Sequence, residues 1–579
     1  MAIINCPGCG KRVSSIAPTC VYCGIKITKE SRQLPAYEVR NRTLIKYNGK
    51  REAISIPGGI EVIGRGAFDG CNTVKRVTIP DSVTTVGDLA FAGCESLESV
   101  TVAEGVKQIG FRSFAGCTSL KKIKLPSTIS SISDRAFENC SDLESISVPR
   151  GVVSIGKEAF YNCSSLKDVR ISSSVTSIGF EAFALCSSLK KIRLGKGVAS
   201  IGGRAFFECV SLSEIDLPDS LSVIGEECFF GCSRLSEVDF GNGVASLGFM
   251  SFAECTSLKE IKLPESLGSI GGKCFNNCSS LAKIELSEGL RDIGSEAFKG
   301  CASLKHVAIP ETIKSFGYEV FSECPKLESI EIGSVRHWCE VEFSLAKSSA
   351  APYPKRLSVE GRIIHDLNII PLNASNIHGA AFANCVDILT ANIGEGILGI
   401  GAQAFLNCTH LQSIRLPNSL SNIGKQAFFN CSALAEVELP DALHSISAAS
   451  FGHCTNLRRV KIGAGVKTID SFAFENCTRL ESIELTGNVT SVAKSAFAGC
   501  TGLKSVVIGK NVESISAGAF EGCTGIKEIR FLHASDEMPR ILIGFNPELD
   551  GAEVVYEESE SEDYNAPKKY FKTGEITLW

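Results

Sequence analysis

Apolar and polar positions along this chain follow a block of twenty-three residues that recurs in strict phase. In the copy that runs from Ile109 to Ser131, the apolar positions are Ile109, Phe114, Cys117, Leu120, Ile123 and Leu125. No single block can bury these side chains by itself, whereas stacked blocks can. A period in this range therefore predicts a solenoid whose repeats cover one another's apolar sides.

Each block predicts two short strands and a turn. The end of Leu120–Leu125 alternates like a half-buried strand, and Ile129 with Ile132 predicts a second short strand. The segment 111–117 is too short for more than a turn or two of helix. The residue before the repeat cysteine is Gly or Asn in fourteen of nineteen copies. Both residue types tolerate positive φ, so we expect the helical turn to end there.

The phase of the repeat divides the chain into parts. The first array covers 60–332 with twelve repeats, from Phe68 and Cys71 to Phe321 and Cys324. The second covers 377–531 with seven, from Phe382 and Cys385 to Phe520 and Cys523. The other expected parts are a cysteine cluster at 1–24, a polar linker at 25–36, an N-terminal cap at 37–59, an irregular spacer at 333–376 and a C-terminal cap and tail at 532–579.

The twenty-six cysteines fall into separate groups. Nineteen are repeat cysteines, Cys228 and Cys274 stand where most repeats carry a small apolar residue, and Cys339 lies in the spacer. Stacking would bring repeat cysteines to about 4.8 Å, within disulfide reach. They show no pairing pattern, and no histidine accompanies them as a base. We therefore expect a ladder of buried thiols without a nucleophilic role.

The remaining four cysteines form two Cys-x-x-Cys-Gly knuckles, with Cys6 and Cys9 in one and Cys20 and Cys23 in the other. Four thiolates converging on one ion suit a closed tetrahedral site, so we expect one structural Zn²⁺. Iron suits four thiolates as well. The paired knuckles, with no thioredoxin-like pattern after them, argue against a redox dithiol. The cluster resembles the short zinc ribbon at the start of many bacterial proteins.

The repeat pattern Ile-Gly-x-x-Ala-Phe-x-x-Cys-x-x-Leu-x-x-Ile-x-Leu-Pro-x-x-Val closely resembles the BspA-type leucine-rich repeats. The stretch from Val335 to Trp338, followed by Pro354, Leu357 and Gly361, resembles the spacer between such arrays. The resemblance implies a curved right-handed solenoid, α/β or β-rich, with short strands and short helical turns. It also implies protein binding, often on microbial surfaces.

Composition and charge reduce the number of function classes that this chain could belong to. A net charge of −5 over 579 residues gives no strong nucleic-acid footprint, and no apolar run is long enough for a membrane helix. No phosphate-binding loop or dinucleotide fingerprint occurs, so we expect no enzymatic activity. The N-terminal residues lack the pattern of a secretory signal, so we expect a cytoplasmic protein that is not inserted in a membrane. Two alternatives stay open: a surface adhesin exported without a standard signal, and a nucleic-acid adaptor that uses the ribbon.

We expect an unidentified protein partner to bind the residues that point out of the longer strand of each repeat. Their charges come in bands, with acidic Glu214, Asp216, Glu237 and Asp239 between basic ones. The simpler interpretation is a solvated face on which charged side chains of neighbouring repeats form ion pairs with one another. The candidate partner-binding residues are Lys121, Lys122, Lys124, Lys190, Lys191, Arg193, Arg458, Arg459 and Lys461.

Overall fold

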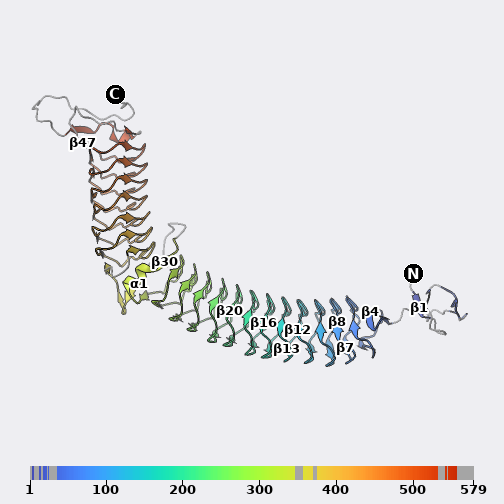
Figure 1. Ribbon diagram of the computed structural model, residues 1–579. Helices are drawn as coiled ribbons and strands as arrows, with labels where there is room; N and C mark the ends of the chain where they lie inside the picture. The colour runs from blue at the N-terminus through green and yellow to red at the C-terminus, as the bar shows by residue number, and fades with distance from the viewer. Residues whose placement is uncertain are drawn as a thin grey trace, which may run out of the picture. The chain divides into compact units, whose positions relative to one another are not determined.

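A computed structural model describes residues 3–5, 12–14, 17–22, 24, 26, 36–345, 356–369, 375–532, 542–543 and 546–556. The chain forms two compact units, Met1–Leu281 and Ala282–Trp579, and each is described by itself. Both are β-solenoids in which every repeat contributes one short strand and one longer strand. Figure 1 shows the strands of successive repeats following one another within each unit.

Unit 1 begins with the antiparallel pairs β1 (Ile3–Asn5) with β2 (Arg12–Ser14) and β3 (Tyr37–Arg40) with β4 (Thr43–Tyr47). Its short strands are β6 (Val62–Ile63), β8 (Thr85–Val86), β10 (Gln108–Ile109), β12 (Ser131–Ile132), β14 (Ser154–Ile155), β16 (Ser177–Ile178), β18 (Ser200–Ile201), β20 (Val223–Ile224), β22 (Ser246–Leu247) and β24 (Ser269–Ile270). Its longer strands are β5 (Ala53–Ser55), β7 (Arg76–Ile79), β9 (Ser99–Val102), β11 (Lys122–Lys124), β13 (Ser145–Val148), β15 (Asp168–Ile171), β17 (Lys191–Arg193), β19 (Glu214–Asp216), β21 (Glu237–Asp239) and β23 (Glu260–Lys262).

Unit 2 repeats this plan. Its short strands are β26 (Asp292–Ile293), β28 (Ser315–Phe316), β30 (Glu342–Phe343), β34 (Asn376–Ile377), β36 (Gly399–Ile400), β38 (Asn422–Ile423), β40 (Ser445–Ile446), β42 (Thr468–Ile469), β44 (Ser491–Val492), β46 (Ser514–Ile515) and β48 (Leu542–Ile543). Its other strands are β25 (Lys283–Glu285), β27 (His306–Ile309), β29 (Ser329–Ile332), β31 (Leu357–Val359), β32 (Arg362–Ile363), β33 (Asp366–Ile369), β35 (Thr390–Ile393), β37 (Ser413–Arg415), β39 (Glu436–Glu438), β41 (Arg459–Lys461), β43 (Ser482–Leu485), β45 (Ser505–Ile508), β47 (Glu528–Phe531) and β49 (Glu553–Tyr556). The described helices are α1 (Val335–Glu340) and the 3-10 turn η1 (Pro547–Leu549).

Successive repeats pair in parallel with the twenty-three-residue register that the sequence predicts. Ile132 lies opposite Ile155, and Ile155 lies opposite Ile178. Equivalent side chains therefore form ladders along each unit. The phenylalanine rings from Phe68 to Phe275 stack with centroids 4.6–5.6 Å apart. Burying one such side chain stabilises the fold by about 1.5–3 kcal/mol, so the phenylalanine ladder makes a large contribution to the free energy of folding.

The Phe-x-x-Cys segments differ from the expected helical turn, because they form consecutive β-turns. Along the segment, backbone amides donate in turn to the segment itself and to the next repeat. Ala92 N donates to Leu89 O within the segment at 3.0 Å, and Phe91 N donates to Ser113 O of the next repeat at 2.7 Å. An α-helix would direct every amide along its own axis. Each segment also has two left-handed residues, such as Leu89 (φ 56°) and Gly93 (φ 64°), which a helix cannot hold.

The repeat cysteines are buried, as the sequence predicts, with Cys71 half-buried at the first repeat. From Cys94 to Cys278 in unit 1, each thiol donates to the carbonyl of the phenylalanine in the preceding repeat at 3.0–3.3 Å. Cys324 and the cysteines from Cys408 to Cys523 in unit 2 do the same. The thiol thus supplies a small hydrogen-bond donor in the buried core.

The ladders end on residues outside the repeat pattern. At the start of unit 1, the ring of Tyr47 stacks on Phe68 at 5.1 Å. In unit 2 the spacer contributes α1, from which the Trp338 indole N–H donates to Ala381 O at 2.8 Å. After the last repeat, the fully buried Asn546 accepts from Phe520 N at 3.1 Å. Side chains therefore replace the missing neighbouring repeat at these ends.

Candidate partner-binding face

The outward side chains of the longer strands form one face, which we call the strand face. Central residues of these strands, such as Ile123 in β11, point into the core, and their neighbours Lys122 and Lys124 point outward. This alternation follows from the two-residue period of a strand. Because the strands pair in register, outward positions of successive repeats lie next to one another. Residue types on this face therefore form bands along each unit.

We call the outward residues of one longer strand and the residue before it a rung of the strand face. Lys121, Lys122 and Lys124 form a cationic rung. All three are exposed, and among the described residues none of them makes an ion pair. Lys122 lies opposite Ser99 and Lys124 lies opposite Thr101, so at these two positions the preceding rung offers hydroxyl groups rather than carboxylates. Glu98 and Glu144 stand at the positions equivalent to Lys121 on the rungs before and after it. Three ammonium groups on one rung thus remain available to an anionic partner.

The second basic group is largely neutralised within the fold. Lys191 forms an ion pair with Glu214 on the next rung, and Arg193 Nη1 lies 2.7 Å from Asp168 Oδ1 on the preceding one. The hydrogen bond from Lys191 holds the pKa of the Glu214 carboxyl below its usual value. Only Lys190 of this group is exposed without an ion pair in the described part of the chain.

Two acidic rungs follow that basic group. Glu214 lies opposite Glu237, and Asp216 lies opposite Asp239. Like charges directly opposite in a sheet are destabilising, so the pairs Glu214–Glu237 and Asp216–Asp239 contribute no favourable charge pairing to the fold. Rungs of one sign thus alternate in groups along the strand face of unit 1, and the basic rung of Lys191 and the acidic rung of Glu214 are neighbours.

The third basic group lies at a groove on the strand face of unit 2. Arg459 and Lys461 line this groove of about 510 Å³ together with Glu436, Glu438 and Glu484. Val460 and Ile462 are half-buried there, because β39 pairs with β41 while β43 belongs to another sheet. Lys461 lies 3.7 Å from Glu438, and the exposed Arg458 is outside the lining. The groove combines apolar surface with charges of both signs.

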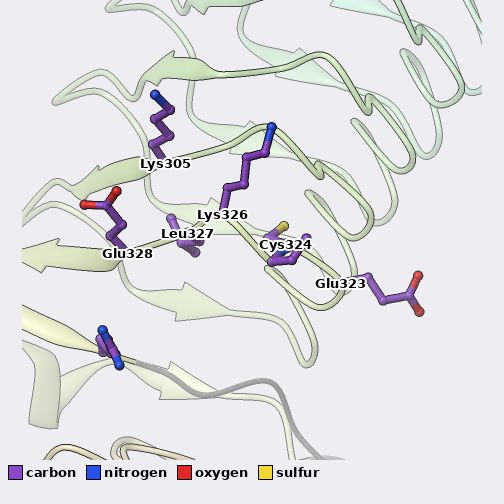
Figure 2. Close-up of a pocket in the computed structure, with 8 residues that line it drawn as sticks. Lys305, Glu323, Cys324, Lys326, Leu327 and Glu328 are labelled. Atoms are coloured by element: carbon purple, nitrogen blue, oxygen red, sulfur yellow. The ribbon is translucent and has the colours of Figure 1, made fainter.

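A second pocket, which the sequence analysis missed, lies where the first array ends. Its volume is about 690 Å³, and it is lined by Lys305, Glu323, Cys324, Pro325, Lys326, Leu327, Glu328 and Arg356. Figure 2 shows Cys324 and Leu327 between the charged side chains. The sequence signal that could have revealed it is the missing Phe-x-x-Cys between Cys324 and Phe382.

Most of the predicted zinc site lies outside the described residues, namely Cys6, Cys9 and Cys23. The fourth predicted ligand, Cys20, is 2% exposed and packs with Val13 and Ala17. Its sulfur accepts from Tyr22 N at 3.4 Å, and its carbonyl accepts from Gly24 N at 2.9 Å. Backbone amides that turn back toward the sulfur and carbonyl of one cysteine fit a metal-binding knuckle. Within the described ranges, no group of three or more His, Cys, Asp or Glu side chains could hold a metal ion.

The repeat cysteines are poor nucleophiles. Burial raises the pKa of Cys140 and of Cys186 to about 12, because a thiolate would be desolvated in the core. The buried thiol ladder is therefore out of reach of other molecules, whereas the outward residues of the strand face are exposed. In the part of the chain that the structure describes, no helix has the length and apolar character to cross a bilayer.

Among solved structures, this chain is similar to leucine-rich repeat proteins. One from Bacteroides ovatus is 23% identical, with 85% of this chain and 94% of that chain covered and a TM-score of 0.33. The pneumococcal vaccine antigen PcpA is 15% identical, with 91% and 98% covered and a TM-score of 0.27. A T. pallidum leucine rich repeat protein is 26% identical, with 38% and 86% covered and a TM-score of 0.25. At these TM-scores the three structures indicate nothing about the partner of this chain.

The curated proteins contain no match to this chain. The family model for the BspA type leucine rich repeat region, by contrast, matches residues 44–167, 153–255, 236–344, 366–477 and 423–540. These matches cover most of the two solenoid units, in agreement with the register and the ladders. The chain therefore belongs to the family of BspA type leucine rich repeat proteins.

Proposed function

We propose that this chain is a non-enzymatic scaffold that binds a partner protein through its strand face. The observation that carries the proposal is the cationic rung of Lys121, Lys122 and Lys124, three exposed ammonium groups without an ion pair in the described residues. Charges arranged in bands favour one partner and one orientation over others. The groove beside Arg459 and Lys461 offers a second contact with apolar character.

The N-terminal segment extends the proposal. Cys6, Cys9, Cys20 and Cys23 would hold one Zn²⁺ with four sulfur ligands and no open position. Such an ion supports folding rather than catalysis, because it has no site for water or substrate. The burial of Cys20 and the amides around it support this assignment. A folded ribbon would be a second module for contacts with proteins.

Affinity capture from the source organism tests the function. We expect a protein to be captured by the wild-type chain and lost when Lys121, Lys122 and Lys124 are replaced by glutamate. Family membership keeps a surface adhesin as the alternative. Fractionation of native cells separates the two, because an adhesin would be found at the surface and an intracellular scaffold would not.

A further inference from the structure

Unit 1 carries aromatic side chains that lie outside its core. The repeat phenylalanines, such as Phe206, are fully buried. Phe180 and Phe249 each stand three residues before a repeat phenylalanine, and they are 41% and 42% exposed. Phe207 and Phe230 directly follow a repeat phenylalanine and are half-buried. We call these four rings the aromatic cluster. They come from consecutive repeats around β20 (Figure 1), where every residue from 178 to 269 is described.

Three of these rings and an arginine lie next to one another. Phe207 and Phe230 stack with centroids 5.2 Å apart and planes 7° apart. The Arg204 guanidinium carbon lies 4.1 Å from the centroid of the Phe207 ring. A Cβ added to Gly203, the residue before Arg204, would meet Cδ2 of Phe180 at 3.5 Å. The cluster therefore continues from one repeat to the next.

Phe249 extends the cluster by one more repeat. Its carbonyl accepts from Glu227 N at 2.8 Å, and Glu227 stands three residues before Phe230. Apolar residues that are exposed singly are ordinary on a protein surface, whereas a continuous group of them marks a contact surface. Aromatic side chains are also the residues that carry much of the binding energy in protein interfaces. The aromatic cluster is therefore a candidate interface.

Carboxylates without an ion pair lie beside the aromatic cluster. Glu208 and Glu226 are exposed and Glu254 is half-buried, and none of the three makes an ion pair with a described residue. Glu208 lies beside Gly231, because a Cβ added to that glycine would meet the Glu208 Cγ at 3.1 Å. Glu226 stands at the position that Phe249 has in the next repeat. These charges attract a cationic partner.

One ring of the cluster already shows how it holds a cation. Arg204 stacks on Phe207 and forms an ion pair with Glu181 at 2.6 Å. The negative face of an aromatic ring attracts the cation, and the carboxylate fixes its position. Phe230 and Phe249 have carboxylates nearby as well, but in the described part of the chain no cation lies over either ring. These two rings are therefore available to a cation from outside.

We propose that the aromatic cluster binds a basic, partly apolar segment of a partner protein. An arginine or lysine of the segment stacks on Phe230, as Arg204 does on Phe207. Its charge pairs with Glu226, and an adjacent apolar side chain packs on Phe249. The cluster belongs to the turn segments and not to the longer strands, so this inference goes beyond the proposed function. One chain holds two partners at separate surfaces.

A short basic peptide serves as the probe. Fluorescein-labelled Gly-Arg-Leu-Arg-Leu-Arg-Gly is titrated with the full chain and followed by fluorescence anisotropy. We expect saturable binding with a Kd below about 1 mM. Phe249→Ser should weaken the binding at least about fivefold. The matched control is Phe111→Ser, which removes a ring at the same repeat position and with the same exposure of 42%, but outside the cluster. This control should leave binding unchanged.

Further variants and a changed peptide separate the contributions. Glu208→Gln/Glu226→Gln should weaken binding, whereas Glu214→Gln/Glu237→Gln, which removes carboxylates of the strand face, should not. Ser in place of both leucines of the peptide should weaken binding. Equal binding of that peptide would indicate simple charge attraction and would overturn the proposal. Absence of binding at about 1 mM chain, or an equal loss in Phe111→Ser or in the strand-face variant, would overturn it as well.

Two measurements keep these results interpretable. Circular dichroism of each variant checks that the fold persists. The variant Lys121→Glu/Lys122→Glu/Lys124→Glu should keep the affinity for the basic peptide, and loss of that affinity would contradict a site separate from the strand face. Absence of the peptide site with continued partner capture at the strand face would overturn this proposal and leave the scaffold function standing.

Discussion

The thiol of Cys140 donates a hydrogen bond to the carbonyl oxygen of Phe114 in the preceding repeat, at 3.2 Å. The same oxygen accepts from the amide of Cys117, also at 3.2 Å. A carbonyl oxygen can accept two hydrogen bonds, and a buried one loses energy if they are not made. Cysteine fits this site because it is small and apolar and still donates. The ladder is thus a hydrogen-bonded part of the core.

The buried thiols predict that the protein loses stability at alkaline pH. Burial raises the pKa of Cys140 to about 12, while an unfolded cysteine has a pKa of about 8.5. Between these values the unfolded chain releases the proton and the folded chain keeps it, so the free energy of unfolding falls as pH rises. Each such thiol contributes up to about 1.4 kcal/mol per pH unit. Urea midpoints measured from pH 7 to pH 10.5 should show a steep decrease above pH 8.5.

A variant with fewer buried thiols provides the control. Replacing Cys140, Cys163, Cys186 and Cys209 with alanine removes four titrating groups and should make the decrease above pH 8.5 shallower. An unchanged slope would show that other groups cause the alkaline loss.

The left-handed conformation of the residue before the repeat cysteine predicts opposite effects of two substitutions on stability. Gly116 has φ 73°, and an added Cβ would meet nothing closer than 3.6 Å. Gly116→Ala therefore has space but costs about 1 kcal/mol of backbone strain. Glu208 occupies the equivalent position with φ 52° and is exposed, so Glu208→Gly should raise stability by up to about 1 kcal/mol. Urea denaturation measures both changes. Gly58→Ala, with open space and no positive φ, should cause no loss, and a loss as large as that of Gly116→Ala would contradict the strain argument.

These positions also show how far the sequence predicts the fold. Gly and Asn before most repeat cysteines indicate a left-handed residue, and the structure has one in every repeat, including Leu185 and His453. The stack itself imposes the conformation, since these residue types do not favour it. The other left-handed residue of each repeat, such as Arg112, has no signal, because that position is rarely glycine.

The sequence predicts the face of the candidate site but only part of its ion pairing. The register places Lys191 beside Glu214, so their ion pair follows from the period once the strands are aligned. The contact of Arg193 with Asp168 is diagonal and depends on side-chain reach. The groove beside Arg459 arises from a break between sheets, although Val460 and Ile462 fit the repeat pattern.

The cap residue Asn546 predicts local loss of protection when it is replaced. Asn546→Ala removes the acceptor for Phe520 N and the donor to Ser516 O, and leaves a buried amide unsatisfied. We expect a cost of about 2–3 kcal/mol, confined to the last repeat. Hydrogen exchange of the Phe520 amide should become roughly 30- to 150-fold faster. The exposed Asn488→Ala should leave that rate unchanged, and equal rates in wild type and Asn546→Ala would contradict the assigned cap.

Metal removal tests the N-terminal site. Native mass spectrometry of the full chain should show one zinc, which is lost after chelation and absent from Cys20→Ser. The thermal transition of the repeats should not change, because zinc supplies folding energy only to the ribbon. Cys71→Ser, which alters a half-buried repeat cysteine, should keep the metal. A metal-free wild-type chain, or iron in place of zinc, would contradict the prediction.

The affinity of the captured partner for the strand face tests the central claim most directly. The dissociation constant is measured for wild type, for Lys121→Glu/Lys122→Glu/Lys124→Glu, and for the control Lys107→Glu/Arg150→Glu/Lys196→Glu, whose exposed residues lie off that face. If the strand face binds the partner, the first variant weakens binding at least tenfold and the control does not. Equal affinities for wild type and the first variant, or equal losses in both variants, would contradict the claim.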